Sequence, residues 1–386
     1  MTMVRDGTTS SPSRRLAGHV RGSPISVNPS PPPPSHESSQ MKYVPLGTTE
    51  IQVSDTCLGT MTYGSQTTEA EGHAQLDAAL DAGINFIDTA EVYPVNPMIA
   101  ETAGRTEEII GTWLAKSSRR DDIVLATKIG GVDSPVRDGA PITVESLDDA
   151  VEASLKRLQT DYIDLYQLHW PNRGGYMFRR NWTFDPSTQN KAETITHMED
   201  ILAALQRHVD AGRIRHIGLS NESAWGTAQW LSVSERIGAP AMVTMQNEYS
   251  LLARLYDTDM AELSHNEQMT LLAYSPLAAG YLTGKYDDGD VPEGSRMSIG
   301  PTMGGRKTDR VLDASRAYVE IARKHDLHPV HMALAFCRQR PFPVVVIAGA
   351  TTMPQLEIIL NGADVVLNEE ILDEIDTAHR AHPMPF

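Results

Sequence analysis

Three short apolar segments of this chain each end in an ionisable side chain, and a tyrosine follows the first of them. Apolar runs of this length predict buried strands, and an ionisable residue at the end of such a strand stands where the chain leaves the core. The segments are residues 84–88, 123–128 and 162–169. The ionisable residues are Asp88, Lys128 and His169, and the tyrosine is Tyr93.

Together these four side chains suit the donation of a proton to a carbonyl oxygen. A tyrosine has an ordinary pKa of about 10, and the ammonium of Lys128 is expected to lower that pKa. Asp88 is expected to pair with Lys128, which holds the lysine charged and in place. His169 is expected either to donate a hydrogen bond to a substrate oxygen or to share the proton with Tyr93. The set contains no nucleophile, so the attacking group must come from a cofactor.

Each of the four also has an ordinary structural explanation. Asp88 would cap a helix or turn, Tyr93 would be a packed loop aromatic, Lys128 a solvated strand end and His169 a satisfied loop histidine. However, all four residues lie at or near three consecutive strand ends, and such a coincidence by chance is improbable. A metal site is the main rival use, but no His-x-His follows an early strand. We therefore expect no catalytic metal.

From residue 42 onward, strand-like and helix-like segments alternate. A hairpin is predicted first, at residues 43–46 and 51–53. Eight strands are predicted after it, at residues 56–60, 84–87, 123–127, 162–168, 214–219, 242–246, 269–274 and 343–347. Helices are predicted at residues 68–82, 104–116, 143–157, 196–211, 222–236, 256–266, 311–325, 353–361 and 369–380. Strict alternation implies a parallel sheet, and eight units favour the α/β class with a closed (β/α)8 TIM barrel.

This architecture places the four side chains together. The C-terminal ends of barrel strands converge on one mouth, where active sites lie. Two connections, residues 170–195 and 278–310, leave these strand ends and are too long for simple turns. They are expected to overhang the mouth and to bind ligand. The hairpin is expected to plug the N-terminal end of the barrel, and the C-terminal extra helix, residues 369–380, to pack outside it.

Composition limits the partners and the compartment. The 386 residues carry a formal net charge of -17, so nucleic acid and anionic lipid are poor partners. No apolar run approaches the roughly 20 residues of a membrane span. Two cysteines, Cys57 and Cys337, are too few for a disulfide framework, which suits a reducing compartment. We expect a cytoplasmic protein that acts on a small molecule.

Residues 1–40 differ from the rest of the chain. Serine and proline dominate, with four consecutive prolines at residues 31–34. Such a segment cannot bury enough apolar surface to fold, so a disordered N-terminal extension is predicted. Its Arg and Ser content also resembles a transit peptide, without the amphipathic pattern of one. Residues 41–386 form the predicted barrel domain, and Met41 is a candidate for the natural start.

A second set of residues suits an anionic cofactor. No Gly-x-Gly-x-x-Gly follows the first strand, so a Rossmann nucleotide site is not indicated. Barrels of this class instead bind phosphate after strands seven and eight. The corresponding stretches, residues 273–286 and 347–352, are rich in Gly, Ser and Thr, whose backbone N–H groups bind anions at helix N-termini. Lys285 and Arg296 add positive charge.

These motifs resemble the aldo-keto reductase family over about residues 42–382, in an order and spacing that make the resemblance specific. The matching stretches are residues 58–61, 88–93, 126–128, 167–171, 217–221, 246–252, 274–286 and 349–352. Details at 159–162, 249–252 and 332–336 resemble most the bacterial Tas-like branch. The resemblance implies a barrel that is monomeric or at most weakly oligomeric and that binds NADPH extended across its mouth.

The resemblance also implies a role for each matching residue. Tyr93 would be the proton donor, with Asp88, Lys128 and His169 as its catalytic partners. Ser220, Asn221 and Gln246 would hold the carboxamide, and Tyr274 would stack on the nicotinamide ring. Ser275, Leu277 and Lys285 would contact the pyrophosphate arm, and Arg296, Thr351 and Gln355 the region of the 2′-phosphate. Gly59, Thr60, Met61, Pro276 and Gly349 complete the expected cofactor-binding set.

One residue departs from the family pattern, and one segment matches no family pattern. Many relatives carry Asn, which bonds the adenine edge, where this chain has Ile359. Residues 297–306 match no family pattern, and they would either close over the cofactor or stay mobile.

The substrate side is rich in bulky aromatics, which favour an apolar or aromatic carbonyl over a free sugar. The alternative is that these residues pack the loop on itself. The expected substrate-binding residues are Tyr63 and Trp170, with Tyr176, Phe178 and Trp182 as further candidates.

The leading hypothesis is the NADPH-dependent reduction of an aldehyde or ketone to an alcohol, with hydride passing to the carbonyl carbon and Tyr93 protonating the oxygen. The first alternative is a slow or non-catalytic nicotinamide-binding redox-sensor subunit, as in the channel-associated branch of the same fold. The second is a metal-dependent barrel hydrolase.

Overall fold

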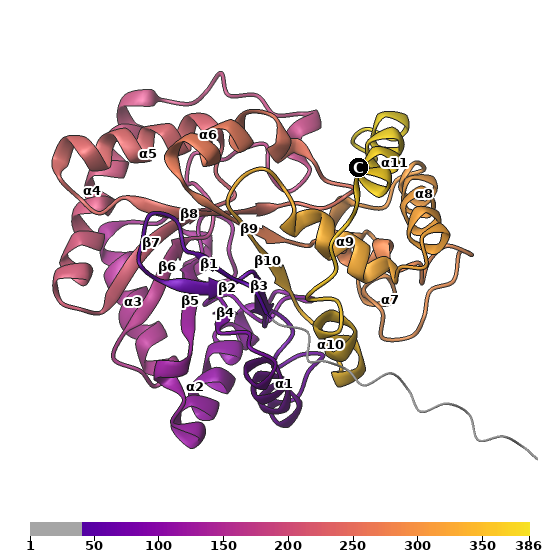
Figure 1. Cartoon of the computed structure of the whole chain (residues 1–386). Helices are drawn as coiled ribbons and strands as arrows, with labels where there is room; N and C mark the ends of the chain where they lie inside the picture. The colour runs from indigo at the N-terminus through magenta and orange to yellow at the C-terminus, as the bar shows by residue number, and fades with distance from the viewer. Residues whose placement is uncertain (1–40) are drawn as a thin grey trace, which may run out of the picture. The chain divides into compact units, whose positions relative to one another are not determined.

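The computed structural model describes residues 41–386. The predicted disordered extension, residues 1–40, lies outside the described residues. In the described part, eight parallel strands form a closed barrel in which β10 pairs back to β3 (Figure 1). The barrel strands are β3 (Thr56–Gly59), β4 (Phe86–Asp88), β5 (Val124–Ile129), β6 (Ile163–Leu168), β7 (Ile214–Ser220), β8 (Met242–Glu248), β9 (Thr270–Tyr274) and β10 (Val344–Ala348). The predicted (β/α)8 barrel is therefore confirmed.

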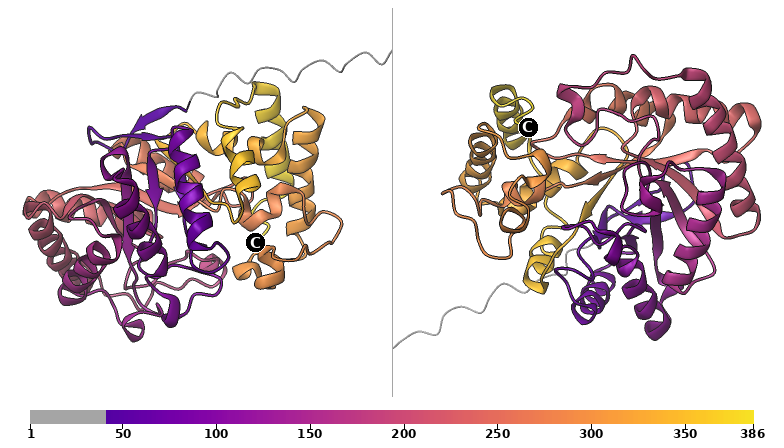
Figure 2. Two further views of the ribbon diagram at one scale, coloured as in Figure 1. Left: turned by 90° about the horizontal axis from the view of Figure 1, so that it is seen from below. Right: turned by 180° about the vertical axis from the view of Figure 1, so that it is seen from behind.

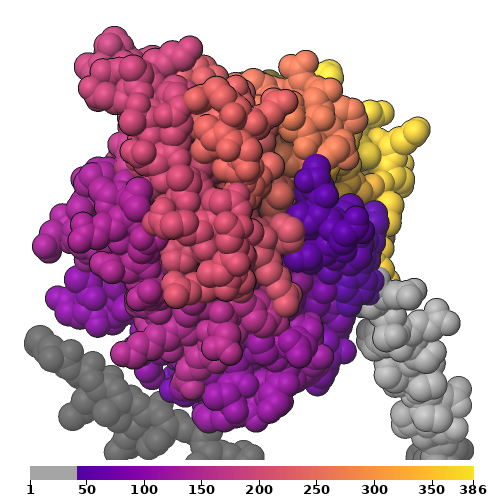
Figure 3. Space-filling model, turned by 90° about the vertical axis from the view of Figure 1, so that its left-hand side faces the viewer, coloured from indigo at the N-terminus to yellow at the C-terminus, as the bar shows by residue number. Residues whose placement is uncertain are grey.

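Helices surround the strands, as both views in Figure 2 show. They are α1 (Glu69–Asp81), α2 (Arg105–Ser117), α3 (Val144–Leu158), α4 (Lys191–Asp210), α5 (Ala224–Ile237), α6 (Asp259–Glu267), α7 (Arg296–Ile299), α8 (Val311–Lys324), α9 (Pro329–Arg338), α10 (Met353–Leu360) and α11 (Glu369–Ala381). Short 3-10 helices cover Ala100–Thr102, Arg120–Asp122, Arg137–Gly139, Arg180–Trp182, Leu255–Asp257, Ala278–Thr283 and Met303–Gly305. On the side that Figure 3 presents, purple, magenta and pink segments form most of the surface.

Local sequence signals explain where several helices begin and end. The Thr143 hydroxyl accepts a hydrogen bond from the Ser146 N–H at 3.2 Å, and the Ser146 hydroxyl accepts one from the Thr143 N–H at 2.8 Å. This reciprocal cap fixes the start of α3. Gly238 ends α5 with a φ of 69°, a left-handed conformation that glycine adopts without strain.

The hairpin β1 (Tyr43–Pro45) and β2 (Gln52–Ser54) plugs the N-terminal end of the barrel, as predicted. Leu46 and Val53 have no exposed surface and pack against side chains from inside the barrel, such as Phe86. At Gly47 a Cβ atom would lie 2.3 Å from the carbonyl oxygen of Val243, at the start of β8. Only glycine permits this close approach, so the plug seats directly on the strands.

The helix α9 is absent from the sequence-based prediction. Residues 332–337 are all buried, so no polar face gives the helix a visible period. Two local signals do mark its start. The His328 side chain accepts a hydrogen bond from the Val330 N–H, and Pro329 occupies the first turn.

The last helix, α11, lies outside the barrel beside α8, as predicted (Figure 1). Lys324 on α8 forms an ion pair with Glu374 on α11, with 2.6 Å between nitrogen and oxygen. None of the helices described for residues 41–386 combines the length and the apolarity that a bilayer span requires.

Candidate active site

Three neighbouring strands bring the four predicted side chains together at the barrel mouth. Asp88 is the last residue of β4, Lys128 stands next to last in β5, and His169 follows β6 directly. The Lys128 nitrogen lies 2.8 Å from the Asp88 carboxylate and 4.9 Å from the centre of the Tyr93 ring. The rings of Tyr93 and His169 meet edge to face with centroids 5.9 Å apart. We call these four side chains the mouth residues.

The Asp88 carboxylate is fully engaged. One oxygen accepts from Lys128, and the other accepts from the Gln246 amide at 2.8 Å and from the Gln167 amide at 3.4 Å. Lys128 also donates to the carbonyl of Thr89 at 2.6 Å. A buried ion pair persists only when such additional hydrogen bonds satisfy both charges. With both oxygens in use, this carboxylate is poorly placed to ligate a metal.

The pKa of Tyr93 departs from the sequence-based prediction. Burial raises the pKa of the Tyr93 phenol well above its ordinary value of 10.0, the Asp88 charge raises it further, and Arg296 opposes both. The predicted lowering is therefore wrong, because burial and the Asp88 charge outweigh any lowering by the nearby Lys128 ammonium. Tyr93 is therefore protonated at neutral pH, as a proton donor must be.

His169 is neutral at neutral pH. Burial, and then the Lys128 charge, lower the pKa of the His169 ring well below its ordinary value of 6.5. Its Nδ1 atom is buried and has no hydrogen-bond partner among the described residues. The neutral ring carries one N–H donor, which is available to an incoming oxygen atom. No hydrogen bond joins it to Tyr93 within the described part of the chain, which favours the first of the two predicted roles.

The predicted carboxamide-binding side chains gather at the ends of β7 and β8. Asn221 donates to the His169 carbonyl at 3.0 Å and accepts from the Tyr274 hydroxyl at 2.7 Å. The Ser220 hydroxyl donates to the carbonyl of Gln246 at 2.8 Å. Tyr274, at the end of β9, is half-buried. These contacts hold the side chains in one fixed set beside the mouth residues.

The predicted phosphate-binding residues occupy the ends of β3, β9 and β10. Thr351 and Gln355 lie together, because the Gln355 side chain accepts hydrogen bonds from the Thr351 N–H and hydroxyl at 3.0 Å each. Gly59 and Gly349 approach closely, since a Cβ on Gly349 would lie 2.6 Å from the Gly59 carbonyl oxygen. Lys285 is exposed in the loop after β9. The remaining predicted positions nearby are Thr60, Met61, Ser275, Pro276 and Leu277.

Arg296 is the strongest candidate for binding an anionic group. This residue is half-buried, and no carboxylate lies within ion-pair distance of it among the described residues. Burial, and then the neighbouring Arg306, lower the pKa of Arg296 to about 10. An unpaired, desolvated cation of this kind fits a phosphate of the expected cofactor.

Comparison with known proteins agrees with this geometry. The family model described as the Aldo/keto reductase family matches residues 55–380. The chain belongs to the aldo/keto reductase family.

Relatives in this family span nearly the whole chain. Protein tas of Escherichia coli (strain K12) is 42% identical over 352 residues, which cover 89% of this chain and 99% of the relative. The uncharacterized oxidoreductase YrpG of Bacillus subtilis (strain 168) is 31% identical over 86% of this chain and 94% of its own length. A probable voltage-gated potassium channel subunit beta of Arabidopsis thaliana is 30% identical over 89% of this chain and 98% of its own length. The family and the relative that is named an oxidoreductase support an oxidoreductase.

Residues 297–306, which matched no family pattern, are anchored in this aldo/keto reductase. Met297 and Met303 are buried, and the Arg306 guanidinium pairs with Glu248 at 2.7 Å. The same carboxylate pairs with Arg179, from the loop after β6, at 2.5 Å. Glu248, at the end of β8, therefore ties together the two long loops that overhang the mouth. Sequence reasoning missed this tie, because nothing in the pattern pairs three residues so far apart.

The two predicted substrate-binding residues lie in different places. Trp170 packs against His169, with ring centroids 4.7 Å apart. Tyr63 has no exposed surface, and its hydroxyl donates to Gln75 of α1 at 3.1 Å. The prediction that Tyr63 lines the mouth is therefore wrong: the chain turns after β3 and buries this ring beneath α1.

Ile359 also lies away from the surface. It is 4% exposed and packs into the core from α10. The Ile359 side chain therefore lies in the core and not at a surface where an asparagine would bind adenine.

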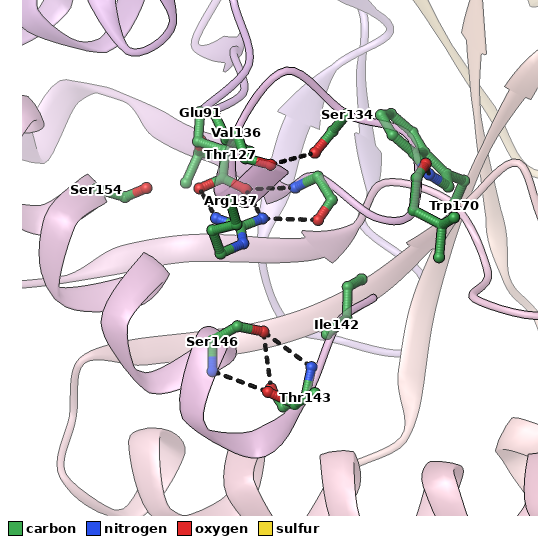
Figure 4. A network of polar contacts seen from close by, with 12 residues as sticks. Glu91, Thr127, Ser134, Val136, Arg137, Ile142, Thr143, Ser146, Ser154 and Trp170 are labelled. Carbon is green, nitrogen blue, oxygen red and sulfur yellow. Dashed lines mark hydrogen bonds and ion pairs between the residues drawn. The ribbon is translucent and has the colours of Figure 1, made fainter. Parts of the chain in front are cut away.

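A buried ion pair that the sequence analysis missed holds the loop after β5 in place. Arg137 donates to both carboxylate oxygens of Glu91, at 2.9 and 2.6 Å, and to the Gly130 carbonyl at 2.8 Å (Figure 4). The carbonyl of Val132 in the same loop accepts the Trp170 indole N–H at 2.8 Å. Glu91 lies two residues before Tyr93 in the chain, so this pair links the loop of Tyr93 to the wall that Trp170 forms.

Proposed function

We propose that this protein reduces an aldehyde or ketone to an alcohol, with NADPH as the hydride donor. The observation that carries the proposal is the meeting of a protonated Tyr93 and a neutral His169 above the Lys128–Asp88 ion pair. Two neutral donors on one side of the mouth suit a carbonyl oxygen, which is uncharged on binding and gains negative charge as it is reduced.

Each mouth residue then has one task. The His169 N–H orients the carbonyl oxygen, and the Tyr93 hydroxyl gives it a proton as charge develops. The raised pKa of Tyr93 means that transfer occurs only to a strong base, which the oxygen becomes once its carbon is reduced. Lys128, 4.9 Å from the Tyr93 ring, stabilises the phenolate that remains. Asp88 positions Lys128 and does not itself touch the substrate.

The residues present fit the cofactor. When bound, NADPH would supply the hydride that the carbonyl carbon accepts. Arg296 offers a guanidinium that pairs with no carboxylate among the described residues, and the half-buried Tyr274 at the end of β9 offers an aromatic ring for a flat heterocycle. Ser220, Asn221 and Gln246 would bind the carboxamide after local exchange of the hydrogen bonds they now make to one another.

Substitution of the donor tests the proposal. We expect Tyr93→Phe to lower kcat for aldehyde reduction by at least a thousandfold while NADPH still quenches tryptophan fluorescence at the same Kd. The control is Tyr318→Phe, which removes the hydroxyl of another buried tyrosine that has no hydrogen-bond partner among the described residues. That variant should keep wild-type turnover. A Tyr93→Phe enzyme with near wild-type rates would contradict the proposal.

One relative supports a second candidate, a slow or non-catalytic redox-sensing subunit. The potassium channel subunit beta of Arabidopsis thaliana is 30% identical over 89% of this chain. The complete set of mouth residues favours turnover over sensing. A steady-state assay separates the two, because a sensor would bind NADPH tightly yet oxidise it on no carbonyl of a broad panel.

A further inference from the structure

A buried ion pair adjoins Asn221, one of the residues predicted to bind the carboxamide of the cofactor. Arg173, in the loop after β6, donates to both carboxylate oxygens of Glu222, which follows Asn221 in the chain. The bond from Nη1 is 2.8 Å long, and Nη2 contacts the other oxygen. Such a two-pronged contact fixes the relative orientation of both groups as well as their distance. We call this ion pair the Arg173 clamp.

The start of α5 is built around the clamp. The Ser223 N–H donates to the Glu222 carboxylate at 2.6 Å, and the Arg173 guanidinium lies over the Trp225 ring, 5.1 Å from its centre. A Cβ atom at Gly226 would overlap the Arg173 guanidinium and the Glu222 carboxylate. Glycine at this position therefore leaves the space that the clamp occupies.

The backbone transmits the position of the clamp to Asn221. Asn221 has a φ of 53°, in the left-handed region that residues other than glycine adopt only when their surroundings fix them. Its N–H donates to the Gln246 carbonyl at 3.0 Å, and the Glu222 carbonyl accepts from the Asn247 side chain at 3.1 Å. Residues 221–222 are thus attached to β8 by these bonds and to the loop after β6 by Arg173.

Asn221 in turn contacts both sides of the candidate active site. Its amide donates to the His169 carbonyl at 3.0 Å and accepts from the Tyr274 hydroxyl at 2.7 Å. It also donates to the Ser220 hydroxyl at 3.0 Å. A displacement of Asn221 therefore disturbs the set of polar groups that the proposed function assigns to the carboxamide.

The charge of Glu222 makes such a displacement the expected result of losing Arg173. Glu222 is 1% exposed, and no cation other than Arg173 lies within ion-pair distance of its carboxylate among the described residues. A buried carboxylate that has lost its partner is strongly destabilising. It would turn toward water, and Asn221 would move with it because the two residues share a peptide bond.

We propose that Arg173 and Glu222 are positioning residues that hold Asn221 in place for the nicotinamide end of NADPH. Neither residue needs to touch the cofactor or the substrate for this role. The inference rests on the proposed function, because it assigns the support of the same cofactor site. It predicts a loss of affinity that is confined to the nicotinamide end.

Two nucleotides separate that end from the rest of the cofactor. The full-length protein is titrated calorimetrically with NADPH and with 2′,5′-ADP, the part of the cofactor that lacks the nicotinamide. We expect Arg173→Met to raise the Kd for NADPH about three- to tenfold, as the loss of one hydrogen bond predicts, and to keep the Kd for 2′,5′-ADP within about twofold. Arg173→Lys retains a cation opposite Glu222 without the two-pronged contact, so its Kd for NADPH should rise only about two- to threefold.

A matched ion pair at the opposite end of the barrel provides the control. Arg120 pairs with Asp164, near the start of β6, at 2.7 Å and lies over the Tyr162 ring, 3.8 Å from its centre. Its two side chains are 16% and 1% exposed, against 11% and 2% in the clamp. Asp164 keeps Arg215 as a second partner, so the loss of Arg120 leaves this carboxylate paired. Arg120→Met should change the Kd of neither nucleotide.

The outcomes separate this inference from the proposed function. Equal weakening of both nucleotides in Arg173→Met, an unchanged Kd for NADPH, or the same loss in Arg120→Met overturns the positioning role and keeps the proposed function. If Arg173→Met binds neither nucleotide, Arg173→Lys decides the matter by the same comparison. A wild-type protein that binds 2′,5′-ADP and NADPH equally weakly or not at all overturns the proposed function and the inference with it.

Discussion

Lys128 and Asp88 form an ion pair that is almost completely shut off from water. Their side chains are 0% and 3% exposed, and 2.8 Å separates the nitrogen from the nearer oxygen. Burial lowers the pKa of Lys128 and the Asp88 charge opposes that effect. The pair sits under the Tyr93 ring, so any change that disturbs it affects both the stability of the barrel and the environment of the proposed proton donor.

Removing one partner should therefore destabilise the protein more than removing both charges. We expect Lys128→Met to lower the free energy of unfolding by about 3–5 kcal/mol, because it leaves a buried carboxylate unpaired. The double variant Asp88→Asn with Lys128→Met should recover more than half of that loss, yet show no turnover. Urea unfolding and an aldehyde assay measure the two properties separately. A double variant as unstable as the single one would show that the uncompensated charge is not the cause.

The ion pair of Arg137 with Glu91 should matter for catalysis beyond its contribution to stability. A closely matched pair, Arg157 with Glu107, contacts Thr127 of β5 and not the loop after β5: both arginine side chains are 24% exposed, and the carboxylates are 4% and 0% exposed. Replacing either arginine by lysine removes a guanidinium fork and should cost about 1–3 kcal/mol of stability. Only Arg137→Lys should also raise KM for aldehydes, by about three- to tenfold, because its loop holds Trp170.

Thermal unfolding and steady-state kinetics of the two lysine variants check this expectation. Equal changes in KM in both variants would mean that Arg137 acts only through general stability. Unchanged kinetics in both would mean that the loop after β5 keeps its position without the ion pair.

Most of the fold and the centre of the candidate site could be predicted from the sequence. Apolar runs with a charge at the end predict buried parallel strands, and a parallel barrel has only one mouth, so Asp88, Lys128 and His169 had to meet. The same reasoning fails for aromatic residues after the strands, because the sequence pattern does not show which of these side chains are buried. Tyr63 and Trp170 both follow barrel strands, yet Tyr63 packs under α1 and Trp170 packs against His169.

Long-range polar contacts are the other part that sequence could not reveal. Glu248 joins Arg179 and Arg306, which are 69 and 58 positions away along the chain. Taken separately in the sequence, each of these residues would be interpreted as an exposed charged side chain. The sequence-based prediction also omitted helix α9, because a helix that is apolar on every side shows no periodic alternation of apolar and polar residues.

The buried His169 should make the stability of the protein fall at acid pH. Its folded pKa lies well below 6.5, and its unfolded pKa is about 6.5. Below pH 6.5 the unfolded chain therefore binds a proton that the folded state does not bind. Stability from this group is unchanged above pH 6.5 and falls below it, by at most about 1.4 kcal/mol per pH unit.

Comparison with His169→Gln isolates this effect, because His197 and His216, whose pKa values are also lowered by burial, remain in both proteins. Between pH 8 and pH 5, the wild type should lose about 1–2 kcal/mol more unfolding free energy than the variant. Parallel stability curves over this range would mean that His169 is protonated in the folded state or solvated.

Restoring the family's asparagine at Ile359 should not restore an adenine contact. The Ile359 side chain is 4% exposed in the core, so Ile359→Asn buries an amide without a partner and removes apolar contacts. We expect a loss of about 2–4 kcal/mol of unfolding free energy and no gain in NADPH affinity. Glu357→Asn, an exposed position on the same helix, is the control for helix propensity and should stay within about 0.5 kcal/mol of wild type. Denaturant unfolding and NADPH titration measure the two quantities, and a stable Ile359→Asn protein with tighter NADPH binding would place this side chain at the cofactor surface after all.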